Sequence, residues 1–389
     1  MENINILKQS LEQQKVSLSR YGIDLLCRLI LALIQTRSVN LQKVAAALYG
    51  PAQVDSHYRR LQRFFAQQIS PEIFAALILE RIAKEGQHLY LSLDRTHWKL
   101  GKTHQNILGL GLLFQGVSIP FMYEVLGKAG NANTDERKRL MKKTLKYLKG
   151  YSCTLLADRE FIGKAWFTFL LKQKNMDFVI RIKSNSWIRL KNGRETYVDR
   201  RSPGQRRNTT KTYEAITLYG SLSLNLICHR PPKEEMVYLV TNHSGLNGAL
   251  KRYGKRWPLE TTFGFLKSRG FDLESTHLAD PKRLKMLIGV LTLCLLWGLR
   301  VGEVLNQKNQ SHVIPIAYLS AMYSSSNAPI ASRIHCHPVI CLTLAGEAAN
   351  WYKAVSMASF LAANVPYTLP STAARRYSKT RSGGFNSGE

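Results

Sequence analysis

Two aspartates in this 389-residue chain stand directly after short apolar segments. Asp94 follows Leu91–Leu93, and Asp158 follows Thr154–Ala157. If these segments are neighbouring strands of one sheet, the two carboxylates lie side by side at its rim. Two anions that close repel each other unless a cation lies between them. Because oxygen ligands suit Mg²⁺ or Mn²⁺ better than zinc, the pattern predicts a divalent-cation site at Asp94 and Asp158.

A third acid lies in a later segment with helical spacing. Positions i, i+3, i+7 and i+14 of that segment are Tyr253, Arg256, Glu260 and Lys267. At 100° per residue they fall within roughly a 60° arc, so one helix face would carry a metal ligand, two cations for phosphate and a hydroxyl. Pro258 has no backbone N–H, so the helix must begin near position 257 or kink there. Tyr253 and Arg256 would then stand on a preceding turn.

Each of these signals has an ordinary explanation when it is taken alone. An aspartate after an apolar strand is more often a turn residue, and an i, i+7 pair is common on solvated helix faces. Trp98 and Trp257 fit core or rim positions, and His97 fits a structural neighbour of Asp94. The three acids occurring together, in order and in suitable elements, carry the prediction.

The composition favours a polyanionic partner. The formal net charge is +29, and the basic residues are spread along the chain rather than collected in a tail. Such a surface attracts nucleic acid through phosphate contacts. A ribosome-bound or merely basic protein would share this charge, so charge alone does not decide between them.

The apolar segments and cysteines predict a cytoplasmic protein without a membrane partner. The longest apolar run, Met286–Leu299, is short for a bilayer and follows three basic residues. The six cysteines form no CxxC pair, and most lie in apolar runs, as reduced buried thiols do. The cluster His335-Cys336-His337 with Cys341 fits no standard zinc spacing.

Residues 1–85 have helical periodicity and contain a possible helix-turn-helix. A helix is expected over 41–48, and Tyr49-Gly50-Pro51 ends it. The next helix is basic and carries Arg59, Arg60 and Arg63. These arginines could face DNA while Leu61, Phe64 and Phe65 face the core. An ordinary corner of a helical bundle has the same pattern, so both interpretations stay open.

From residue 86 the period changes to that of strands. Three strands are expected over 88–93, 106–114 and 117–126, followed by a helix that opens with the capping box Asn133-Thr-Asp-Glu136. A strand over 153–157, a helix over 161–174 and a strand over 176–182 complete the order. A meander followed by crossovers matches a ribonuclease H-like fold.

The chain therefore divides into five predicted regions of an α/β protein. A helical DNA-binding domain spans 1–85, and a ribonuclease H-like catalytic core spans 86–182 and 241–311. A β-rich insertion, 183–240, interrupts the core. Residues 312–389 are rich in Ala and Ser, have almost no acids and show no sustained periodicity, so they form an atypical tail.

At this point the sequence resembles DDE transposases of bacterial insertion sequences. Tyr253-x2-Arg256-x3-Glu260-x6-Lys267 matches the YREK signature of the group named after insertion sequence four, and Asp158-Arg-Glu-Phe161 resembles its second-Asp segment. Val54–Phe65 is also similar to the N-terminal region of that group. The resemblance covers about residues 40–305. The interval of 102 residues from Asp158 to Glu260 leaves room for the β insertion of these enzymes.

The resemblance implies an endonuclease that joins DNA. Asp94, Asp158 and Glu260 would hold two Mg²⁺ or Mn²⁺ ions, and water would nick the element's end before its 3′ hydroxyl attacks target DNA. Tyr253 and Arg256 would position phosphate, and Lys267 would pair with DNA at the element's end. Double-stranded DNA, as terminal repeats and target, would be the partner of a homodimer on paired ends, and the protein would be associated with bacterial DNA. Relatives also place aromatics near a flipped base, where this chain has Trp257.

The tail departs from the family pattern, because relatives continue with a basic helical C-terminal region. A frameshifted or replaced tail would explain residues 312–389 and could leave the protein inactive despite its three acids. Two other functions stay open: a nuclease of the same fold without strand transfer, and a DNA-binding remnant of a transposase without catalysis.

Overall fold

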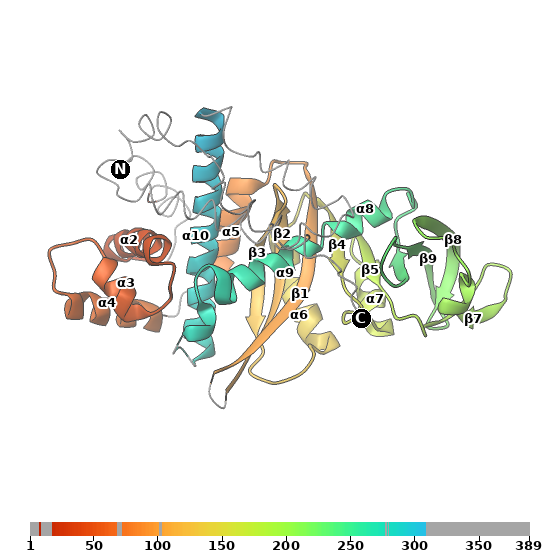
Figure 1. Ribbon diagram of the computed structural model, residues 1–389, viewed down its shortest axis with the longest axis horizontal. Helices are drawn as coiled ribbons and strands as arrows, with labels where there is room; N and C mark the ends of the chain where they lie inside the picture. The colour runs from red at the N-terminus through yellow and green to blue at the C-terminus, as the bar shows by residue number, and fades with distance from the viewer. Residues whose placement is uncertain are drawn as a thin grey trace, which may run out of the picture.

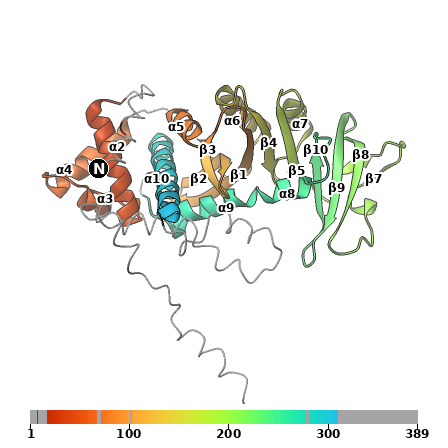
Figure 2. The same cartoon turned by 90° about the horizontal axis from the view of Figure 1, so that it is seen from above.

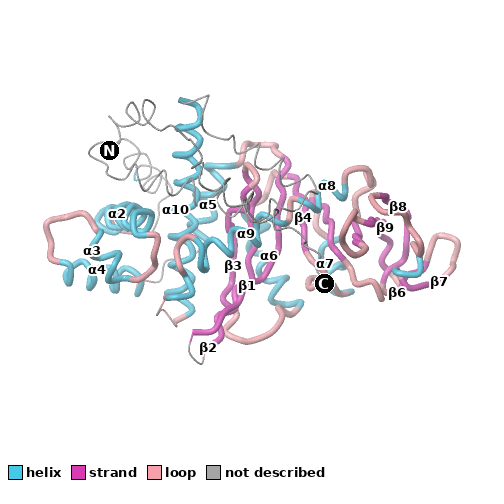
Figure 3. Tube along the Cα trace, in the orientation of Figure 1, coloured by secondary structure: helices cyan, strands magenta, loops and turns pink. Residues whose placement is uncertain are grey.

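The computed structural model describes residues 18–67, 72–100, 103–276 and 280–308, together with Lys8 and Leu278. Helices gather at one end of the molecule, a ten-stranded sheet with helices on both faces occupies the middle, and the sheet's last strands form the other end (Figures 1 and 3). The predicted tail and the His335–Cys341 cluster lie outside the described residues.

The N-terminal part is helical, as expected. It contains α2 (Arg20–Thr36), α3 (Leu41–Ala47), α4 (Val54–Ala66) and α5 (Glu72–Ile82). Side-chain caps begin two of them: Ser19 accepts from a backbone N–H of α2, and Asn40 accepts from two of α3. The apolar side of α2 packs against α10 (Pro281–Lys308), so the last described helix closes this group of helices.

The first five strands form the predicted meander and crossovers. They are β1 (His88–Leu100), β2 (Thr103–Phe114), β3 (Val117–Val125), β4 (Ser152–Ala157) and β5 (Met176–Arg181). The order is β3-β2-β1-β4-β5, with β1–β2–β3 antiparallel and β1–β4–β5 parallel. The crossovers use α6 (Thr134–Tyr147) and α7 (Lys164–Leu171), which cover one face of the sheet, while α9 (Trp257–Gly264) covers the other (Figure 2).

The local signals for α6 are confirmed. The Asn133 side chain accepts from the Glu136 backbone at 2.9 Å, and the Glu136 carboxylate accepts from the Asn133 backbone at 2.7 Å. This reciprocal pair satisfies two of the backbone donors that a helix start leaves without partners. The helix therefore begins where the sequence predicts.

The β-rich segment is continuous with the main sheet. Its strands are β6 (Trp187–Arg189), β7 (Glu195–Tyr197), β8 (Thr209–Leu218), β9 (Leu222–Arg230) and β10 (Val237–Thr241). Strand β10 pairs antiparallel with β5, and the order continues β5-β10-β9-β8-β6-β7. The segment thus extends the edge of the parallel strands, which the sequence did not reveal.

Two elements differ from expectation around the acids. Strand β1 was predicted to end at residue 93, but it runs to Leu100 because its antiparallel pairing with β2 continues to Leu100↔Thr103. Asp94 therefore lies inside β1, at the point where the parallel pairing with β4 stops. Helix α7 is shorter than the predicted 161–174, since the backbone turns at Phe161 before the helix starts.

The helical segment that carries Glu260 is interrupted, as Pro258 predicts. Helix α8 spans Ala249–Gly254, α9 begins at Trp257 with Pro258 in its first turn, and a π-helical turn follows over Phe265–Arg269. The start of α9 at Trp257 confirms the break expected at Pro258, so the four functional side chains do not share one continuous helix face. Those side chains come from α8, the α8–α9 junction, α9 and the π-helical turn.

No helix among the described residues is long and apolar enough to cross a membrane. The four cysteines in the described part of the chain, Cys27, Cys153, Cys228 and Cys294, are buried free thiols.

Candidate active site

Asp94 and Asp158 directly follow the last residues that pair the parallel strands β1 and β4. The last paired residues of β1 and β4 are Leu93 and Ala157, and each is followed by its aspartate. The two carboxylates make the same local contact: each accepts a hydrogen bond from the next backbone N–H, at 2.8 Å for Asp94 and 2.6 Å for Asp158. The sheet thus places two similarly oriented acids at one rim, as the sequence predicts.

Two glycines of β2 let α9 approach this rim. A Cβ at Gly109 would lie 2.3 Å from Phe263 Cζ, and a Cβ at Gly111 would lie 2.8 Å from Leu259 Cδ1. Both α9 side chains are buried, Leu259 at 0% and Phe263 at 4% exposure. Because Gly109 is the β2 partner of Asp94, α9 crosses the sheet beside that residue. Glu260 lies between Leu259 and Phe263 in sequence, so α9 places it near Asp94.

The three acids are within electrostatic reach of one another. Burial raises the pKa of Asp94 from 3.8 to about 6, against the lowering effects of the Arg95 N–H and the Arg256 guanidinium. Glu260 and Asp158 raise this pKa further, because each adds negative charge beside the Asp94 carboxylate. Residues separated by 166 positions in the chain are therefore one cluster in the fold.

Arg256 occupies the cationic position in this cluster. Its Nη1 donates to Glu260 Oε1 at 2.5 Å, and its guanidinium lies 5.6 Å from the centre of the Tyr253 ring. Burial acts to lower the pKa of Arg256, but Tyr253, Glu260 and Asp158 outweigh it and raise the pKa above its ordinary value. Burial also raises the pKa of Tyr253. The arginine is thus a fixed positive charge among the acids.

The donor set suits a hard divalent cation. Within the described ranges, no three His, Cys, Asp or Glu side chains are gathered closely enough to hold a metal ion together. Asp94 and Asp158 nevertheless lie side by side where the pairing of β1 with β4 stops, and Glu260 is engaged by Arg256. A cation between the acids would relieve the repulsion that raises the pKa of Asp94, and carboxylate oxygens are the ligands that Mg²⁺ and Mn²⁺ prefer.

Lys267 belongs to the YREK spacing, but it contacts a part of β1 beyond Asp94. Its Nζ donates to the His97 carbonyl at 3.2 Å and pairs with Glu274 at 3.0 Å. It also lies 6.0 Å from the centre of the Trp98 ring. The described structure therefore places Lys267 three residues along β1 from Asp94, where its charge flanks the cluster.

The three predicted DNA-facing arginines lie on α4, outside the sheet that carries Asp94 and Asp158. Arg59 and Arg63 are exposed on α4 and Arg60 is half-buried, while Leu61 and the two following phenylalanines are buried. Helix α4 is at the opposite end of the molecule from the β-rich segment (Figure 1). The alternation of exposed and buried residues on α4 agrees with the expected division into a solvent face and a core face.

Sequence reasoning missed several charged residues at the site. Arg181 ends β5, next to β4, and its charge lowers the pKa of Tyr253. An arginine at the end of the strand beside Asp158 was a usable signal. Arg95 and Glu160 form an ion pair at 2.7 Å across 65 residues, and no local pattern indicates it.

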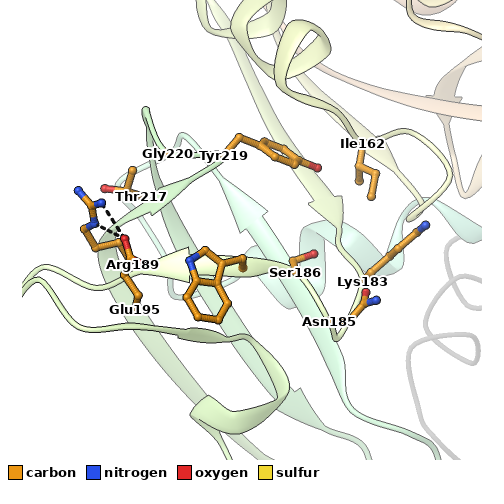
Figure 4. A pocket seen from close by; sticks show the side chains of 10 residues that line it. Ile162, Lys183, Asn185, Ser186, Arg189, Glu195, Thr217, Tyr219 and Gly220 are labelled. Carbon is orange, nitrogen blue, oxygen red and sulfur yellow. Dashed lines mark hydrogen bonds and ion pairs between the residues drawn. The ribbon is translucent and has the colours of Figure 1, made fainter.

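A pocket of about 400 Å³ opens farther along the same sheet edge (Figure 4). Ile162, four residues beyond Asp158, and Lys183, two residues beyond β5, belong to its lining. Trp187 also lines it and is 49% exposed. Aromatic and basic side chains therefore continue from the acid cluster toward the β-rich end.

Comparison with known families decides the identity of this region. The family model described as "Transposase DDE domain" matches residues 86–297, which is more than half of the chain.

The chain belongs to the DDE transposase family. The matched region begins just before β1 and ends within α10, so it contains all three acids of the cluster. Helices α2–α5 lie outside it. Family membership implies a metal-dependent nuclease or transferase, and DNA as the partner of this DDE transposase.

Two further comparisons concern solved structures and curated proteins. The cryo-EM structure of the piggyBac transposase synaptic complex with hairpin DNA is similar, with a TM-score of 0.43 and 13% identity, covering 93% of this chain and 76% of that chain. A comparison with curated proteins finds no match.

Proposed function

We propose that this DDE transposase belongs to the YREK group, has a ribonuclease H-like core, and cleaves the ends of an insertion sequence and joins them to target DNA. The observation that carries the proposal is the acid cluster: Asp94 and Asp158 directly follow the paired residues of adjacent parallel strands, and both Asp158 and Glu260 raise the pKa of Asp94. The YREK spacing adds Tyr253 and Arg256 to the same cluster.

Asp94, Asp158 and Glu260 are the residues that would hold Mg²⁺ or Mn²⁺, as a pair of ions. When bound, such a pair stabilises the attacking and the leaving oxygen of a phosphoryl transfer. Glu260 is ion-paired with Arg256 in the structure, so ligation by Glu260 would exchange this contact for the metal. Arg256 is then free to bind a phosphate oxygen, for which its planar donors are suited.

The cations around the cluster support DNA binding. Arg181 and Lys267 flank it on either side, and the pocket with Lys183 and Trp187 continues the same edge. We propose that this edge binds the DNA strand whose phosphate lies at the acids. Trp187 provides an exposed aromatic face on which a base can stack.

The helical N-terminal part is proposed as a second DNA-binding surface, through Arg59, Arg60 and Arg63 of α4. Two of these arginines are exposed, and the chain carries a net charge of +29. Contacts from arginine to phosphate add affinity for any sequence and weaken with salt. A homodimer on paired element ends is part of the same proposal.

Incubation of the full chain with DNA carrying the element's own terminal repeat, in Mg²⁺ or Mn²⁺, tests the function. Wild type should cut at the repeat's end, and Asp158→Ala should not. Adding target plasmid separates the alternatives, because joined product appears for a transposase and cut ends alone for a nuclease. Binding without cleavage in either metal would identify a DNA-binding protein without catalysis and would overturn the proposal.

A further inference from the structure

The loop that follows Asp158 is held by a side chain from β1. Arg95 Nε donates to Glu160 Oε1 at 2.7 Å, and its Nη2 donates to Glu160 Oε2 at 3.2 Å. The pair is largely shielded, with 13% of the Arg95 side chain and 22% of the Glu160 side chain exposed. Arg95 also donates to the side-chain oxygens of Asn106 at 3.4 Å and Asn131 at 3.2 Å. Its guanidinium therefore has little freedom to move.

The same loop is held from the other side by Arg137 of α6. Its guanidinium donates to the carbonyls of Glu160 at 3.0 Å, Ile162 at 3.1 Å and Ala132 at 2.7 Å. It also lies 5.3 Å from the centre of the Phe161 ring, and the residue is only 7% exposed. Arg137 thus anchors the loop backbone, while Arg95 anchors the Glu160 carboxylate.

These contacts join the segment beside Asp94 to the loop beside Asp158. Arg95 directly follows Asp94, and Glu160 is two residues beyond Asp158. Successive side chains of a strand point to opposite faces, so Arg95 leaves β1 on the side away from Asp94. A bidentate arginine–carboxylate pair fixes both separation and orientation. The pair therefore restrains the spacing between the two aspartates without occupying the space between them.

We propose that Arg95 and Glu160 are a positioning pair that sets the distance between Asp94 and Asp158 and thereby the affinity of the acid cluster for divalent cations. This inference rests on the proposed function of the cluster. The two aspartates directly follow Leu93 and Ala157, which pair across adjacent parallel strands, so their like charges act to separate β1 from the loop. The positioning pair opposes that separation before any cation arrives.

The test measures Mn²⁺ binding to the full chain by electron paramagnetic resonance of the free ion, beside a thermal unfolding curve for each variant. Glu160→Gln keeps the shape of the side chain and removes its charge, and Arg95→Gln removes the other partner. Each should weaken Mn²⁺ binding about tenfold, the scale seen when residues that orient metal ligands are changed. The double variant should bind about as weakly as either single variant, because both remove one interaction.

Glu124→Gln is the matched control. Glu124 is a buried glutamate of the same sheet, paired with Arg139 at 3.0 Å and Lys143 at 3.1 Å, and it lies on β3. It should leave Mn²⁺ affinity unchanged even if it lowers the unfolding temperature. If Glu160 had only a structural role, Glu160→Gln and Glu124→Gln would behave alike. In both, Mn²⁺ affinity would fall only as far as the unfolding temperature falls.

The outcomes separate the two proposals. If wild type and Asp158→Ala bind Mn²⁺ equally, the acid cluster is not a cation site, and the proposed function and the positioning pair both fail. If wild type binds through Asp158 but Glu160→Gln binds equally well, only the positioning pair is overturned. Additive losses in the double variant would also overturn it, since independent effects are not those of a pair.

Discussion

The acid cluster and helix α4 carry charge in opposite ways. At the rim of β1 and β4, Asp94 is desolvated enough for its pKa to rise to about 6, and Arg256 is ion-paired at 2.5 Å. On α4, Arg59 and Arg63 are exposed. The acid cluster holds its charges at fixed positions, whereas α4 exposes its charges to solvent.

This difference indicates what each region can do. Fixed, desolvated charges favour chemistry, because their geometry is set before the substrate arrives. Exposed arginines favour affinity for phosphates, which is graded, salt-dependent and tolerant of position. Substitutions in the two regions should therefore differ in kind as well as in size.

The largest effect is expected from Asp158→Ala. It removes one of the two acids that directly follow the paired residues of the parallel strands, so DNA cleavage should fall by on the order of 10³-fold or more, equivalent to about 4 kcal/mol of transition-state stabilisation. DNA affinity, measured by fluorescence anisotropy, should change little. Equal losses of binding and cleavage would contradict a mainly chemical role for Asp158.

Gly109→Ala should disturb the docking of α9. The new Cβ would overlap Phe263, so either that ring or the whole helix must shift, at a cost of about 1–3 kcal/mol in the free energy of unfolding. Cleavage should fall as well, because Glu260 is part of α9 and would move with it. Chemical denaturation and the cleavage assay measure the two effects.

Gly254→Ala is the control for that substitution. Gly254 ends α8, and nothing lies within 4 Å of the position that a Cβ would take. Stability should stay unchanged or rise slightly. If Gly109→Ala behaves in the same way, the close packing of α9 on β2 does not set the position of Glu260.

Asp94→Asn should stabilise the protein when divalent ions are absent. The folded pKa of about 6 lies above the ordinary 3.8, so the charged form of Asp94 opposes folding. That penalty is complete above pH 6 and disappears as the pH falls toward 4. Near pH 7.5 the substitution should add about 1–3 kcal/mol to the free energy of unfolding, and below pH 4 it should add nothing.

The matched control on the other region is Asp55→Asn. Asp55 is exposed in the first turn of α4, where a carboxylate interacts favourably with the helix dipole, so its removal should give no gain at any pH. Urea denaturation at three pH values measures both variants. A gain from Asp55→Asn as large as that from Asp94→Asn would remove the distinction between the two regions.

The smallest effect per residue is expected on α4. Arg59→Gln and Arg63→Gln should each weaken DNA binding for all sequences and reduce the slope of log affinity against log salt by about 1. The cleavage rate at saturating DNA should stay at the wild-type value. A loss of cleavage that persists at saturation would show that these arginines act on the chemistry as well.

The elements were predictable where the signal is local. Short apolar segments defined the strands before Asp94 and Asp158, and the Asn133 cap defined the start of α6, because these depend on neighbouring residues. Pro258 correctly indicated that the helix carrying Glu260 begins anew. The strand order also indicated that Asp94 and Asp158 lie side by side.

What could not be predicted depends on pairing between distant segments. The continuation of β1 to Leu100 depends on β2, and the union of the β-rich segment with the main sheet depends on β10 pairing with β5. The ion pair between Arg95 and Glu160 spans 65 residues, and neither side chain differs in sequence pattern from a solvated charge. Spacing rules describe one element at a time, so contacts between elements escape them.

The central claim is that Asp94, Asp158 and Glu260 form one cation site, and a crystal of the full chain soaked in Mn²⁺ tests it most directly. Anomalous scattering should place manganese between the two aspartates, with Glu260 turned from Arg256 toward the metal. Manganese absent from that position, with Glu260 still bound to Arg256 in crystals that also contain the element's end DNA, would contradict the account.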